Sequence, residues 1–153
     1  MVAAVSLNSD FWSPNRQLVD TYSYRCETSR NLLVGDTPAL ADELAALVLA
    51  GVKTATCWAA LEGLKTEPGK LTVMLGGNGR PLAVIETVEL TLRRFDEVDA
   101  SFAYDEGEED RSLASWREGH RHYFTRLGQF SPDMMVSCER FRIVERLWSG
   151  KPP

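Results

Sequence analysis

The segment AGVKTATCWAA, residues 50–60, places one lysine and two threonines, Lys53, Thr54 and Thr56, just after a glycine. If this segment forms a strand, its side chains alternate between two faces, so Lys53 shares a face with Cys57, opposite to both threonines. An ammonium group and two rotatable hydroxyls suit an anion or a carbonyl oxygen as ligand. In a partly dry pocket a lysine also loses its proton and becomes a base. The alternative is a surface lysine whose stem covers apolar residues while its ammonium stays in water.

A second group of reactive residues is the acidic segment YDEGEED, residues 104–110. Glu106 is the best candidate to turn inward, because Gly107 after it permits an unusual backbone turn. Clustered carboxylates also bind divalent cations, and the candidate metal ligands here are Glu106, Glu108 and Asp110. The alternative is a solvated acidic loop in which Asp110 caps the following helix and stabilises its positive end.

The segment after the acidic residues, 111–127, has the pattern of an amphipathic helix. Trp116, His120 and Phe124 recur every four residues and therefore lie on one stripe of that helix. His120 is then either a buried structural imidazole or part of a pocket wall. His122 lies away from the stripe, and we expect it to be solvated.

The remaining pattern predicts the elements that must position these groups. Helices are predicted at 37–51, with Thr37 as the cap, at 95–103 and at 110–128. A hairpin is predicted at 70–95, and a final strand with alternating side chains at 133–148. The second strand of the hairpin is long, so a bend or bulge is expected in it. This order predicts an α+β domain built on a small mixed barrel.

Composition limits the class of protein. The chain has 153 residues, 44% of them hydrophobic and 25% charged, which is typical of one soluble domain. It contains no apolar run long enough to cross a bilayer and no signal-peptide pattern, so we expect a cytoplasmic location and no membrane partner.

The cysteines and charges narrow the class further. Three cysteines without C-x-x-C spacing argue against a disulfide framework or a cysteine-rich zinc site, and we expect inert thiols. The net charge of −5 argues against strong non-specific binding of nucleic acid. Residues 116–126 nevertheless gather three arginines and both histidines, so a local basic surface is compatible with the acidic total.

Three segments together resemble a known family: LADELAALVLAGVKTAT, FDEVDASFAYDEGEEDRSLASWREGHRHYF and MMVSCERFRIVER. They are similar to the bacterial branch of the ASCH domain, named for activating signal cointegrator 1 homology, over residues 31–147. The resemblance implies a PUA-like fold, a small, mostly antiparallel β-barrel with flanking helices and a cleft. We expect residues 30–148 to form this domain and residues 1–29 to be an N-terminal extension packed on it.

The resemblance also implies a set of site residues. ASCH proteins have been proposed to bind RNA, some resemble amidohydrolases that deacylate N4-acetylcytidine, and others have been linked to cleavage of single-stranded RNA. By position, the catalytic set carried over to this chain is Lys53, Thr56 and Glu106. The expected substrate-binding residues are Thr54, Trp58, Tyr104, Glu108, Trp116 and His120.

We therefore expect an RNA-directed hydrolase, with a ribonuclease ranked before an amidohydrolase and a non-catalytic RNA- or nucleotide-binding module third. In RNA cleavage, Lys53 stabilises charge on the phosphate and Glu106 is the base. In amide hydrolysis, Thr56 attacks, Lys53 takes its proton, and Glu106 needs a raised pKa to protonate the amine. The expected partner is single-stranded RNA or a modified nucleoside. The only candidate cofactor is a divalent cation, and a homodimer is left open.

Overall fold

The computed structural model describes residues 37–150, so the predicted N-terminal extension, residues 1–29, lies outside the described residues. The helices are α2 (Pro38–Leu49), α3 (Ala100–Glu106) and α4 (Leu113–Arg126), and two 3₁₀ turns lie at Ala60–Glu62 and Phe95–Glu97. The strands are β1 (Ala55–Ala59), β2 (Leu71–Leu75), β3 (Pro81–Arg94) and β4 (Met135–Arg146). Within residues 37–150, no helix has the length and apolar character needed to span a membrane.

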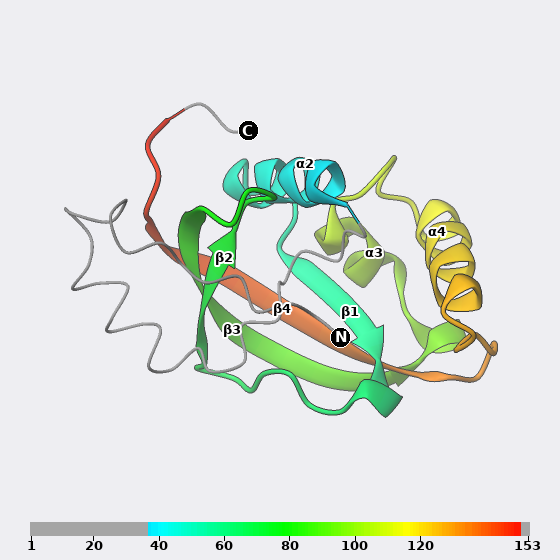
Figure 1. The fold of residues 1–153 in the computed structure, drawn as a ribbon. Coiled ribbons are helices and arrows are strands. Elements are labelled where there is room, and N and C mark those ends of the chain that lie inside the picture. The colour runs from blue at the N-terminus through cyan, green and yellow to red at the C-terminus, as the bar shows by residue number, and fades with distance from the viewer. Residues whose placement is uncertain (1–36, 151–153) are drawn as a thin grey trace.

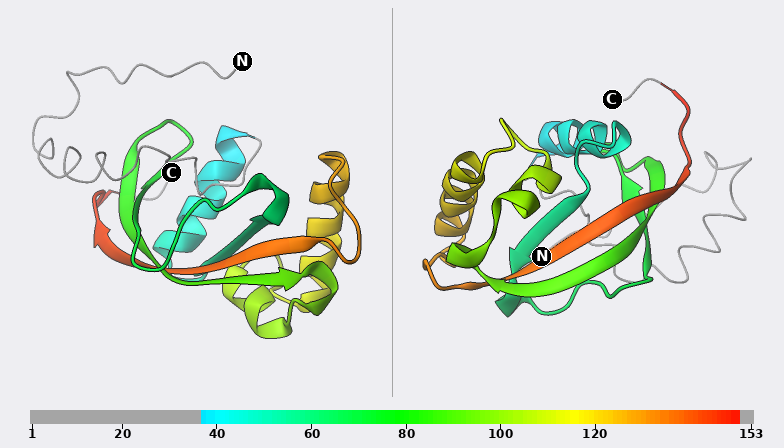
Figure 2. Two further views of the ribbon diagram at one scale, coloured as in Figure 1. Left: turned by 90° about the horizontal axis from the view of Figure 1, so that it is seen from below. Right: turned by 180° about the vertical axis from the view of Figure 1, so that it is seen from behind.

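The four strands form one antiparallel sheet in the order β1-β4-β3-β2. The pairing of β3 with β4 shifts register between Val84 and Ile85 and again between Thr87 and Glu89. Such bulges bend a strand and increase its twist, so the long pair β3–β4 curls into a half-barrel (Figure 2). The predicted α+β fold with a curled antiparallel sheet and flanking helices is confirmed, as is the predicted bend in the long strand.

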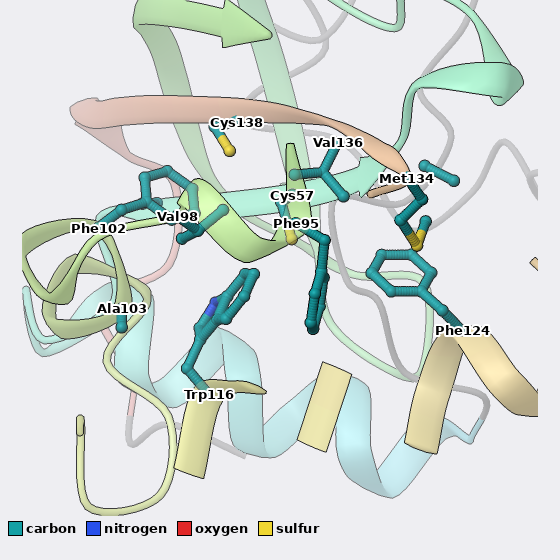
Figure 3. Packing of buried hydrophobic residues seen from close by; sticks show 12 residues of the cluster. Cys57, Phe95, Val98, Phe102, Ala103, Trp116, Phe124, Met134, Val136 and Cys138 are labelled. Atoms are coloured by element: carbon teal, nitrogen blue, oxygen red, sulfur yellow. The ribbon is translucent and has the colours of Figure 1, made fainter. Parts of the chain in front are cut away.

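Each face of the sheet carries its own core. Helix α2 covers one face, where its apolar residues pack against side chains that include Ile85 and Phe141. Helices α3 and α4 cover the other face near β1 (Figure 1). There Trp116 and Phe124 point from α4 toward the sheet and meet Cys138 among others (Figure 3). The alternation of side chains along β4 explains why Cys138 and Phe141 belong to different cores.

Helix boundaries follow the capping residues. Thr37 caps α2 as predicted, since its Oγ1 accepts the backbone N–H of Leu40 at 3.2 Å. The predicted helix at 95–103 is wrong in position, because Asp99 accepts the N–H of Phe102 at 2.8 Å and starts α3 at Ala100.

The start of α4 also differs from the prediction. The helix begins at Leu113, where the hydroxyl of Ser112 accepts the N–H of Ser115 at 3.1 Å. Asp110 is not the cap, because its carboxylate instead accepts the N–H of Ser112 at 2.9 Å. This short turn orders the end of the acidic loop before the helix begins.

Candidate functional site

Lys53 is held in the connection between α2 and β1. Its backbone N–H donates to the carbonyl of Leu47 at 3.1 Å, and the N–H of Thr54 donates to the carbonyl of Asp105 at 2.7 Å. The end of α3 approaches this connection closely at Gly107, whose φ is 71°. A Cβ at Gly107 would collide with the Val52 carbonyl. Glycine therefore allows the acidic loop to reach the lysine, as the sequence predicted.

The Lys53 side chain is buried, with 3% of its surface exposed, and its ammonium faces two glutamates. Nζ donates to Glu108 Oε1 at 2.6 Å and to the backbone carbonyl of Glu106 at 3.3 Å. It also lies 3.6 Å from Glu106 Oε2. Glu106 is 1% exposed, whereas the Glu108 side chain is 37% exposed. The alternative of a solvated surface lysine is therefore wrong.

His120 adds a second cationic group to Glu106. Its Nε2 lies 3.4 Å from Glu106 Oε2, and its Nδ1 donates to the carbonyl of Trp116 at 2.9 Å. The imidazole stacks on the Trp116 ring with 4.2 Å between centroids and 20° between planes. The Glu106 carboxylate also has a side-chain hydrogen bond with the Cys57 thiol, and within residues 37–150 its buried Oε1 meets no N–H or O–H donor. One carboxylate oxygen is thus shared by two cationic groups, and the other meets no N–H or O–H donor in the part of the chain that the structure describes.

These contacts set the charges of the site. Burial alone would raise the pKa of Glu106, but His120 and Lys53 outweigh burial and lower this pKa to about 2. Burial alone would lower the pKa of Lys53, but Glu106 and Glu108 outweigh it and raise the pKa. The pKa of His120 is likewise raised, because the charge of Glu106 outweighs burial. At neutral pH the site therefore holds an ammonium beside a carboxylate.

A pocket of about 290 Å³ opens beside this pair, between β1, the end of α3, α4 and Leu40 near the start of α2. Among the predicted site residues, those in its lining are Thr56, Glu106, Glu108, Trp116 and His120. Lys53 is not part of the lining and reaches the pocket through Glu106. Strand alternation directs the Thr56 side chain away from Cys57, toward the face of its β4 partner Glu139.

Three of the predicted substrate-binding residues lie elsewhere. Thr54 is fixed to α3, with its hydroxyl 3.4 Å from the carbonyl of Asp105. The indole N–H of Trp58 donates to the carbonyl of Gly63 at 2.9 Å, and that side chain is buried outside the pocket. Tyr104 is exposed, and the guanidinium of Arg111 lies 3.5 Å from its ring centroid.

The potential metal ligands that converge differ from the predicted set. Within residues 37–150, the group of three whose ligand atoms lie within 4.8 Å of one another is Cys57, Glu106 and His120. Asp110 is fixed at the start of α4, and Glu108 is paired with Lys53.

Cys57 and Cys138 are free, buried thiols whose pKa burial raises, which agrees with the prediction of reduced thiols that are buried or inert. The position of Cys57 in the lining of the pocket was not predicted. The sequence carried a signal for this position. Side chains alternate along a strand, and Lys53 and Cys57 each lie two residues from Ala55, so they point to the same face. The α4 residues Ser115, Gly119 and His122, spaced by four and three, also line the pocket and follow a helical period.

The comparisons with known proteins agree with this fold. The family model of the ASCH domain matches residues 30–145. The ASCH domain from Lactobacillus crispatus JV V101 is 30% identical, with a TM-score of 0.71 over 91% of this chain and 99% of that chain. Protein EF3133 from Enterococcus faecalis V583 is also 30% identical, with a TM-score of 0.66 over 78% of this chain and 81% of that chain. No curated protein matches the chain.

The fold and the matched sequence place the chain among the PUA-like proteins, a class often proposed to bind RNA. Within that class, the chain belongs to the ASCH family.

Proposed function

We propose that this ASCH domain binds single-stranded RNA and cleaves it with Lys53 and Glu106. The observation that carries the proposal is the buried ammonium–carboxylate pair, 3.6 Å between Nζ and Oε2, at the edge of a small pocket. Burial matters because electrostatic interactions are stronger where water is excluded.

The size of the pocket favours one unpaired nucleotide. Its volume of about 290 Å³ is at the low end for small-ligand pockets, so a duplex cannot enter. Single-stranded RNA presents bases that can be splayed out and stacked on aromatic rings. His120 is the stacking surface in this proposal. Trp116 is 5% exposed, packs against Phe95 and Phe102, and supports the imidazole from behind.

The charges suit cleavage by the RNA's own 2′-hydroxyl. Glu106 accepts the proton of that hydroxyl, and the oxygen attacks phosphorus. The bond from phosphorus to the 5′-oxygen breaks, which leaves a 2′,3′-cyclic phosphate, and protonated His120 gives its proton to the leaving oxygen. Lys53 stabilises the charge on the phosphate oxygens.

The pairing of Lys53 with Glu108 does not block this role. Glu108 is partly exposed, so a phosphate can take its place beside the ammonium while the carboxylate turns into water. An anionic phosphate near the site also raises the pKa of Glu106 and makes it a better base than in the free protein.

The test is cleavage of a labelled single-stranded RNA by the full chain after treatment with a chelator. We expect a 2′,3′-cyclic phosphate product and a rate lower by about 100-fold or more in Lys53→Met and in Glu106→Gln. Lys65→Met is the matched control, because Lys65 forms a 2.6 Å ion pair with Glu62 away from the pocket. Equal cleavage of DNA of the same sequence, or full activity in Glu106→Gln, would contradict the mechanism.

A second candidate is the amidohydrolase reaction on N4-acetylcytidine. It is favoured by the presence of Thr56 in the wall of a nucleoside-sized pocket. The ionisation of the site opposes it, because attack by Thr56 needs a neutral Lys53 and a protonated Glu106, and the pKa shifts of both groups run the other way. Acetate release without RNA cleavage would decide for this reaction. Binding without either product would decide for a non-catalytic module.

A further inference from the structure

We propose that Cys57, Glu106 and His120 form a zinc site with one coordination position open to the pocket. The inference goes beyond the proposed function, because it concerns a metal and needs no RNA.

The geometry of the three ligands is the first support. The Cys57 sulfur, a Glu106 carboxylate oxygen and a His120 ring nitrogen all lie within 4.8 Å of one another. They come from β1, the C-terminal end of α3 and the middle of α4, so packed elements hold them. Because zinc binds such ligands at about 2.0–2.3 Å, the three ligand atoms move closer together when one ion contacts all of them.

The unsatisfied carboxylate oxygen is the second support. Glu106 is 1% exposed, and its Oε1 meets no N–H or O–H donor among the described groups. A buried carboxylate oxygen that accepts no hydrogen bond is costly, so this oxygen is available to a ligand such as a metal ion. Its other oxygen, Oε2, already faces Lys53 and His120.

The orientation of His120 is the third support. Its Nδ1 donates to the carbonyl of Trp116 at 2.9 Å, which leaves Nε2 as the nitrogen directed at Glu106. Histidines that bind metals usually donate their other ring N–H to a carbonyl or carboxylate, which fixes the tautomer. The stacked Trp116 ring holds the imidazole plane in this orientation.

The donor set selects the metal. Thiolate and imidazole are ligands that zinc prefers, whereas magnesium and calcium prefer oxygen alone. Zinc binding releases the thiol proton of Cys57 and any second proton of His120 to solvent, so that the thiolate and Glu106 together neutralise the ion. The charge of Lys53 stays matched by Glu108 at 2.6 Å. All three ligands line the pocket, so a fourth ligand, such as water, enters from there.

Zinc and the proposed RNA cleavage use Glu106 in different ways. With zinc bound, Glu106 is a ligand, and in the zinc-free protein it is available as a base. The cleavage assay is performed on chelator-treated protein, and the metal assay contains no RNA. Failure of one proposal is therefore distinguishable from failure of the other.

The experiment is titration of the metal-free full chain with Co²⁺, a spectroscopic substitute for zinc. We expect a thiolate-to-cobalt charge-transfer band that saturates at about one ion per chain and disappears when Zn²⁺ is added. Absence of this band in the folded wild-type chain would overturn the proposal, whatever the variants do.

Variants assign the ligands. We expect Cys57→Ser to lose the thiolate band and His120→Gln to weaken cobalt binding by about 100-fold or more. Cys138→Ser is the matched control, because Cys138 lies directly opposite Cys57 in the β1–β4 register and is outside the ligand set. A band that persists in Cys57→Ser, or that Cys138→Ser alone abolishes, would refute the assignment. Circular dichroism of each variant shows whether it is folded.

Discussion

The stability of the Lys53→Met variant tests whether the buried ion pair has the character described above. The change keeps an unbranched side chain of similar length and removes the charge together with the hydrogen bonds that Nζ donates to Glu108 and to the Glu106 carbonyl. Glu106, at 1% exposure, then loses the cation 3.6 Å from its Oε2 and keeps only His120. Glu108 also loses its partner, but it is partly exposed and water can solvate it.

The expected cost follows from burial. Removing one partner of a buried ion pair leaves an uncompensated charge and costs about 3–5 kcal/mol of the free energy of unfolding. The control is Lys65→Met, which breaks an ion pair of the same 2.6 Å length as Lys53–Glu108, but at the surface. Surface pairs contribute about 0–1 kcal/mol, so the control variant is expected to be nearly as stable as the wild type.

The assay is urea unfolding at pH 7, followed by tryptophan fluorescence and circular dichroism. Only the midpoint is expected to change, because the surface exposed on unfolding, and with it the slope, stays the same. A double variant, Lys53→Met with Glu106→Gln, removes the orphaned charge and is expected to recover most of the loss. If Lys53→Met costs no more than Lys65→Met, or if the double variant is less stable than Lys53→Met, the argument from buried charge is wrong.

Two further predictions concern backbone and burial. Gly107→Ala is expected to lose about 2–4 kcal/mol of stability and most RNA cleavage, because φ is positive there and the new Cβ meets the Val52 carbonyl. Gly69→Ala is its control, since φ is also positive but nothing lies within 4 Å, and a loss as large as that of Gly107→Ala would contradict the steric reason. Burial raises the pKa of Glu139, although the Thr87 hydroxyl donates to its carboxylate at 2.6 Å. The pKa of Glu139 is higher in the folded chain than in the unfolded chain, where it lies near 4.5, so the free energy of unfolding falls as the pH rises from 4.5 through the folded-state pKa. Glutamine does not ionise, so Glu139→Gln is expected to gain stability relative to wild type between pH 5 and pH 8. Paired urea titrations at the two pH values measure this gain, and a difference between variant and wild type that does not change with pH would refute it.

The elements with strong local signals were predictable from the sequence. The cap at Thr37, the turn between β2 and β3, and the alternation in β4 each depend on neighbouring residues only. The start of α3 was misplaced because Asp99, a good cap, follows a second acidic turn at 95–97, and local propensity does not rank the two. The start of α4 was misplaced for the same reason, since both Asp110 and Ser112 are suitable caps.

The candidate site was predictable in part. Lys53 and Glu106 were expected to meet, and the structure brings them together. The approach of Cys57 to Glu106 and His120 was not predicted, because it depends on how α3 and α4 pack against β1. Local patterns give the face of each element but not the distance between elements far apart in sequence.

Helix α4 has one set of residues that holds it to the sheet and another that borders the pocket. Trp116 and Phe124 hold it to the sheet, while Ser115, Gly119 and His122 border the pocket without belonging to that core. Substitutions at these three border positions can therefore reshape the pocket at little cost in stability. Variation in ligand preference among proteins with this architecture is expected to concentrate on that side of the helix, and a library built there is a direct route to altered specificity.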